Sequence, residues 1–170
     1  RRGLDEDGPE LLPRMDSAES FQFDEAQTPF ETESSRQRLE FLSSRIVRDR
    51  AFRKIILHAY DERCAVTGLR LINGGGRAEV DAAHIRPVEA NGPDVVNNGI
   101  ALSGTAHWMF DRGLITLSDD LKILISRQVN DAEGVRGLLN KTGYAIAPKH
   151  RYQRPHPHFL KWHRDNCFKQ

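Results

Sequence analysis

The feature that most constrains this chain is a pattern of two short strands followed by a helix. Residues 78–85 and 99–103 have strand character, and Pro87 ends the first of these segments. Thr105 can cap a helix that continues to about residue 112 and stops at Gly113. The sequence therefore predicts a strand–loop–strand–helix unit over residues 78–113.

Four polar residues are spaced along this unit. His84 lies near the end of the first strand and Asn98 at the start of the second, while His107 and Asp111 share one helix face. Neutral imidazole is the usual general base near pH 7, and imidazole with carboxylate suits a divalent cation. Phosphodiester hydrolysis needs both, because water must lose a proton while negative charge builds on the phosphoryl oxygens.

The spacing resembles that of the HNH, or ββα-metal, endonucleases, whose pattern is a histidine, an asparagine about fourteen residues on and a histidine about nine further. Here the steps from His84 to Asn98 and on to His107 are fourteen and nine. The segments Cys-Ala-Val-Thr-Gly (64–68), Ala-Ala-His-Ile-Arg-Pro (82–87) and His-Trp-Met-Phe-Asp-Arg-Gly (107–113) extend the resemblance. It implies an α+β fold with a ββα core at about 78–113, flanking helices and an extra β-hairpin.

The resemblance also implies roles for these residues. His84 would be the general base, and His107 and Asp111 would bind one divalent ion, Mg²⁺ or Mn²⁺, with Ni²⁺, Co²⁺ or Zn²⁺ as alternatives. Asn98 would either orient the base and its loop or bind the metal, and the sequence leaves both roles open.

Two further residues have alternative interpretations. Many family members place an acidic residue or histidine just before the base, where this chain has Ala83. Asp81 could supply the missing ligand, or it could be a surface carboxylate. Arg86 could clamp a phosphate bidentately, or it could form a surface salt bridge.

Three other segments resemble a subgroup of predicted bacterial restriction endonucleases, in which an HNH domain follows an N-terminal EVE (PUA-like) reader of modified bases. These segments are residues 73–81, 102–105 and 155–163. The resemblance implies a metal-dependent DNA endonuclease, the catalytic part of a modification-dependent restriction enzyme in the bacterial cytoplasm. No reader domain fits in residues 1–34, so modified-base recognition would reside in a part outside this chain.

Charge divides the chain into two parts. Residues 1–34 hold ten of the 24 acidic residues and three of the 25 basic ones, so residues 35–170 carry eight more basic residues than acidic ones. We expect an acidic linker or arm over 1–34 and the nuclease domain over 35–170, with the basic surface that DNA binding requires.

Outside the strand–loop–strand–helix unit, the sequence predicts three more elements. Residues 35–60 form an amphipathic helix with one potential break, and its arginines either follow a DNA backbone or form a solvated face. Residues 114–126 form a hairpin, and residues 159–168 form a last helix.

Several alternatives concern the whole protein. The chain has no apolar stretch that could span a bilayer, and its two distant cysteines suit a reducing cytoplasm. Because a double-strand break with one active site usually needs two copies, we expect a homodimer. The alternatives to a restriction nuclease are a non-catalytic DNA-binding module on the same scaffold and a colicin-like toxin nuclease.

Overall fold

The computed structural model describes residues 32–170, with side chains from Leu42 onward. The expected acidic arm therefore lies outside the described residues, apart from 32–34, which belong to the first helix. In chain order the elements are α1 (Thr32–Ala59), β1 (Asp81–His84), η1 (Val88–Ala90), η2 (Val96–Asn98), β2 (Gly99–Leu102), α2 (Gly104–Asp111), β3 (Ile115–Leu117), β4 (Ile123–Ile125), α3 (Ala132–Leu138), η3 (Arg151–Gln153) and α4 (Pro157–Asn166). The mixture of helices and small antiparallel sheets confirms the predicted α+β class.

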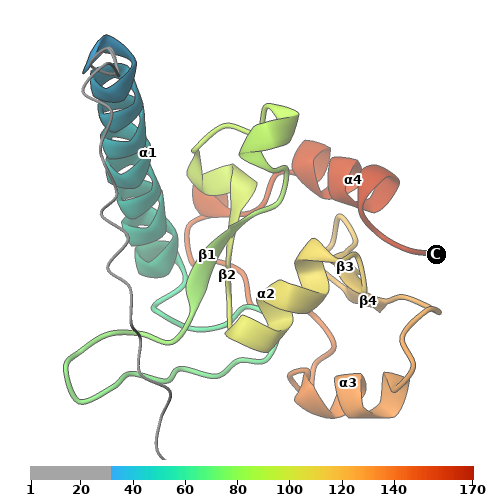
Figure 1. The fold of residues 1–170 in the computed structure, drawn as a ribbon. Helices are drawn as coiled ribbons and strands as arrows, with labels where there is room; N and C mark the ends of the chain where they lie inside the picture. The colour runs from blue at the N-terminus through green and yellow to red at the C-terminus, as the bar shows by residue number, and fades with distance from the viewer. Residues whose placement is uncertain (1–31) are drawn as a thin grey trace, which may run out of the picture.

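The predicted order of strand, loop, strand and helix is observed in residues 78–113. Strands β1 and β2 pair antiparallel with His84 opposite Gly99, and β3 pairs antiparallel with β4 as the expected hairpin. Figure 1 shows the β1–β2 pair in the middle of the molecule, with α1 on one side and α4 with β3 and β4 on the other. Strand β1 covers Asp81–His84 and is therefore shorter than the predicted segment 78–85. Before it, Ala78 forms only an isolated bridge with Ile72.

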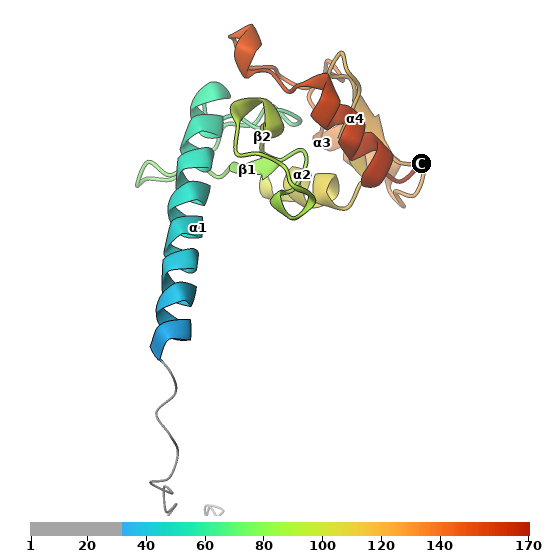
Figure 2. The ribbon, with the colours of Figure 1, turned by 90° about the horizontal axis from the view of Figure 1, so that it is seen from above.

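The prediction for α1 was partly wrong. The helix is unbroken, begins at Thr32 rather than Ser35, and its N-terminal half extends away from the body (Figure 2). Consequently Leu42 and Ile46, which the periodicity assigned to an apolar face, are about half exposed, as is Ile55. Among the described side chains of α1, those in the core come from its C-terminal half, from Phe52 onward.

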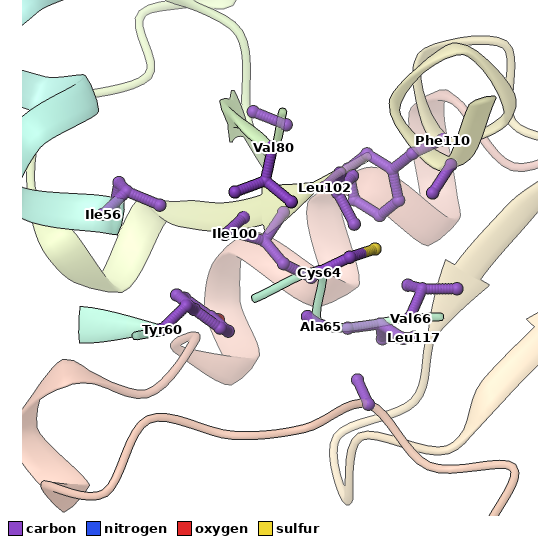
Figure 3. Close-up of a cluster of buried hydrophobic side chains, with 14 of the residues drawn as sticks. Ile56, Tyr60, Cys64, Ala65, Val66, Val80, Ile100, Leu102, Phe110 and Leu117 are labelled. Atoms are coloured by element: carbon purple, nitrogen blue, oxygen red, sulfur yellow. The ribbon is translucent and has the colours of Figure 1, made fainter. Parts of the chain in front are cut away.

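The core lies where α1 crosses the central strands. Its side chains come from the end of α1, the turn at residues 64–66, both central strands, α2 and β3 (Figure 3). The turn is held to the sheet because the Ala65 amide donates to the Ala101 carbonyl at 2.8 Å. Cys64 at this turn is fully buried. No helix in residues 32–170 is both long and apolar enough to cross a membrane.

Helix α4 packs against α2 and β3, and its buried residue His163 contacts both elements. The ring of His163 stacks on Phe110 with centroids 3.8 Å apart, and its Nε2 donates to the Phe110 carbonyl at 3.1 Å. Its Nδ1 then accepts a hydrogen bond from the Thr116 hydroxyl at 2.8 Å. Burial, with a contribution from the positive charge of Arg164, lowers the pKa of His163 to about 4.

We predict that substituting Gly99 destabilises the domain. A Cβ at this position would collide with the side chains of Ile56 and Phe52, so Gly99→Ala should lower the free energy of unfolding by about 1–3 kcal/mol. The matched control is Gly137→Ala in α3, where a Cβ meets no atom within 4 Å. Urea unfolding of both variants checks this, and equal stabilities would contradict the close packing at Gly99.

A second prediction concerns acid stability. Because the pKa of His163 is about 4 in the folded state and near 6.5 in the unfolded chain, the unfolded chain binds more protons between these values. The contribution of His163, on the order of 3 kcal/mol, is present above pH 6.5 and is lost as the pH falls toward 4.

We therefore expect His163→Gln, which offers an amide donor and acceptor in place of the two ring nitrogens, to unfold with a weaker pH dependence between 6.5 and 4 than the wild type. The same substitution at the exposed His58 should leave the pH dependence unchanged. Chemical denaturation across this pH range measures the difference, and parallel curves for wild type and His163→Gln would exclude the buried neutral imidazole.

Candidate active site

A cleft of about 590 Å³ lies between α1 and the central unit. One wall is α1, which contributes four arginines: Arg45, Arg48, Arg50 and Arg53. The other wall contains His84, His107 and Asp111, with Asp81 also on the lining. The structure thus brings His84 and the His107–Asp111 pair, predicted from spacing alone, to one concave surface.

His84 is held from two directions at the end of β1. Its ring stacks on Phe52 of α1 with centroids 3.9 Å apart and planes within 6°. Its Nε2 lies 2.7 Å from Oδ1 of Asp94 in the loop between the two strands. The second oxygen of Asp94 lies 2.8 Å from Nε of Arg48, so imidazole, carboxylate and guanidinium form a continuous chain.

Asn98 is fully buried and uses its amide to hold the loop of residues 86–97. Its Oδ1 accepts from the Arg86 amide at 2.9 Å, and its Nδ2 donates to the Arg86 and Pro93 carbonyls at 3.0 and 2.9 Å. Both amide hydrogens are therefore engaged, and Asn98 is not on the cleft lining. Asn98 was expected either to orient the base and its loop or to bind the metal. Its hydrogen bonds fit the first role, because they hold the loop.

His107 and Asp111 form a pair of potential metal ligands on the cleft lining. They lie one turn apart on α2, with Nε2 and Oδ2 3.4 Å apart, and both face the cleft. One imidazole nitrogen and one carboxylate oxygen match the ligand types that divalent cations accept, so the pair fits a metal with water and phosphate completing its shell. The described residues contain no group of three or more His, Cys, Asp or Glu side chains arranged to hold a metal ion.

Asp81 is engaged elsewhere. Its Oδ1 lies 2.8 Å from Nε of Arg53, whose guanidinium also donates to the Val80 carbonyl.

Cys167, another residue on the cleft lining, has a thiol whose pKa is raised by burial and by the negative charge of Asp111. A raised pKa disfavours the thiolate that metal binding requires.

Arg86 does not reach the cleft lining. Its Nε donates to the Ala90 carbonyl at 2.7 Å, and its guanidinium lies over the ring of Trp162, 5.7 Å from the centroid. These contacts join the loop between the strands to α4. These contacts differ from both roles that the sequence left open for Arg86, a phosphate clamp and a surface salt bridge.

Two residues of the site were missed by sequence reasoning. Asp94 belongs to a segment, Asn-Gly-Pro-Asp at 91–94, whose composition indicates a loop and nothing more. Phe52 lies within the helix predicted over residues 35–60, and no sequence signal links it to His84. Neither has a sequence signal that relates it to the base, because both contacts depend on how α1 and the loop pack around β1.

Comparison with known proteins supports the assignment of the central unit. Residues 64–118 match the family model of the HNH endonucleases. No curated protein matches the chain in sequence. Among solved structures, one that resembles it is described as a modification-dependent TagI restriction endonuclease, with 26% identity and a TM-score of 0.52.

That match covers 68% of this chain but 36% of the other, so the chain spans about a third of that enzyme's length. The matched family segment contains His84, Asn98 and His107 in the spacing that defines the predicted site. The chain therefore contains a segment, residues 64–118, that is similar to the HNH endonucleases, and its fold is similar to that of a restriction endonuclease.

Proposed function

We propose that this chain is the catalytic part of a metal-dependent restriction endonuclease that hydrolyses DNA phosphodiesters. The observation that supports the proposal is one cleft whose lining includes His84, the His107–Asp111 pair and four arginines of α1. A general base, a ligand pair and a positively charged wall are the groups that backbone hydrolysis requires.

In this proposal α1 binds the DNA backbone. Its cleft-facing arginines include Arg45 and Arg50, which are exposed. Outside the helix, Arg45 pairs with the exposed Glu89 at 3.7 Å. Exposed ion pairs contribute little and are easily exchanged for a phosphate. Binding would therefore be strongly salt-dependent, as expected when arginines release the counterions of DNA.

His84 acts as the general base. It removes a proton from a water molecule whose oxygen forms a bond to phosphorus while the bond from phosphorus to the 3′ oxygen breaks. The products carry 5′-phosphate and 3′-hydroxyl ends. His107 and Asp111 would hold a divalent cation, which supplies positive charge to the phosphoryl and leaving oxygens when it is bound.

The restriction role is the finer part of the proposal. The similar solved structure is named as a modification-dependent restriction endonuclease, and this chain corresponds to about a third of its length. We propose that this chain supplies cleavage in an enzyme of the same kind, and that recognition of modified bases is the task of another domain. A homodimer would provide the second cleft that a double-strand break requires.

We expect purified protein to nick or cut supercoiled plasmid in Mg²⁺ or Mn²⁺ and to be inactive in EDTA. His84→Ala should lower the cleavage rate about 10²–10⁴-fold, because it removes the base. The matched control is His58→Ala, an exposed histidine of α1 outside the cleft, which should cleave like the wild type. DNA binding without cleavage by the wild type would favour a non-catalytic binding module.

A separate prediction tests the ligand set. Asp111→Asn should weaken Mn²⁺ binding at least tenfold, by analogy with the sensitivity of metal sites to altered ligands and their partners. Asp81→Asn should leave Mn²⁺ affinity unchanged, because Asp81 pairs with Arg53. Isothermal titration without DNA measures both, and an equal loss in Asp81→Asn would show that Asp81 is a ligand.

A further inference from the structure

The contact between His84 and Asp94 fixes which ring nitrogen of His84 carries the hydrogen. A carboxylate can only accept, so the 2.7 Å contact with Asp94 places the hydrogen on Nε2. Nδ1 then holds the free lone pair. Both side chains are about four-fifths buried, which protects the contact from competing water.

The backbone of the loop holds Asp94 from one side. Asn98 donates to the carbonyl of Pro93, the residue before Asp94, at 2.9 Å. The Gly92 amide donates to the Pro87 carbonyl at 2.9 Å, and a Cβ at Gly92 would collide with the Arg86 carbonyl. The loop is therefore tightly turned just before Asp94, which leaves the carboxylate little freedom to move away from the ring.

Helix α1 holds the same pair from the other side. Arg48 and Phe52 are four residues apart, so they share one face of the helix. Arg48 binds the oxygen of Asp94 that His84 leaves free, while Phe52 stacks on the His84 ring. One helical turn thus contacts both members of the histidine–carboxylate pair.

We propose that Asp94 is the positioning residue of the base and that Arg48 positions Asp94. This inference rests on the proposed nuclease function and deepens it. Asp94 orients the ring of His84 and holds its hydrogen on Nε2, so that Nδ1 is the nitrogen that removes the proton from water. Arg48 occupies the second carboxylate oxygen, which stops Asp94 from turning away from the ring.

The first test reads the ring directly, without DNA or metal. In protein with ¹⁵N-labelled histidine, the His84 signals are identified by their absence in His84→Ala. We expect a single tautomer with the hydrogen on Nε2 in the wild type and a mixture of tautomers in Asp94→Ala. A wild-type ring with its hydrogen on Nδ1, or an unchanged spectrum in Asp94→Ala, would overturn the inference.

The second test separates positioning from DNA binding. Asp94→Ala should lower kcat about 10- to 100-fold, part of the contribution of a general base, with little change in KM. Arg48→Ala should raise KM and also lower kcat. The matched control is Arg45→Ala, which removes another α1 arginine whose partner is Glu89, and it should raise KM alone.

The two tests also distinguish the inference from the proposed function. A wild type that binds DNA but never cuts it would refute the nuclease proposal, while the ring spectrum would still decide whether Asp94 sets the tautomer. A wild type that cuts, combined with an Asp94→Ala variant of normal kcat and normal unfolding free energy, would refute the positioning role alone.

Discussion

The packing of α1 across β2 at Gly99 is the contact on which the rest of the structure depends. Because Gly99 has no Cβ, the side chains of Phe52 and Ile56 can lie directly against the strand. Ile56 is fully buried there and anchors the helix, while Phe52 stacks on His84 across the β1–β2 pair. The same contact therefore closes the core, orients the ring and sets the arginines of α1 along the cleft.

Buried polar side chains in this domain form hydrogen bonds that join separate segments of the chain. No buried side-chain nitrogen or oxygen among the described residues lacks a hydrogen-bond partner. Asn98 joins the two ends of the loop, and His163 joins α4 to α2 and β3. Since leaving such groups unpaired would cost about 1–3 kcal/mol each, their partners fix the positions of the segments that carry the site.

Sequence reasoning predicted the elements that carry the site more accurately than the surroundings of the site. The strands, the hairpin, α2 and α4 follow from short apolar segments and glycine stops, which are local signals. Helix α3 was not predicted, and the N-cap of α2 is Ser103 rather than the expected Thr105. Helical spacing correctly placed His107 and Asp111 on one face. Periodicity failed at Leu42 and Ile46, because an apolar stripe does not reveal whether another element is present to cover it.

By itself, the sequence determined the α+β class, the histidine–asparagine–histidine spacing and the position of His107 and Asp111 on one helix face. Only the tertiary structure decided that Asn98 faces the loop, that Asp81 pairs with Arg53, and that Asp94 and Phe52 hold the base. The physical reason is separation along the sequence. Spacing within one element fixes which side chains share a face. Contacts between α1, the loop and β1 instead depend on packing between segments that are distant in the chain.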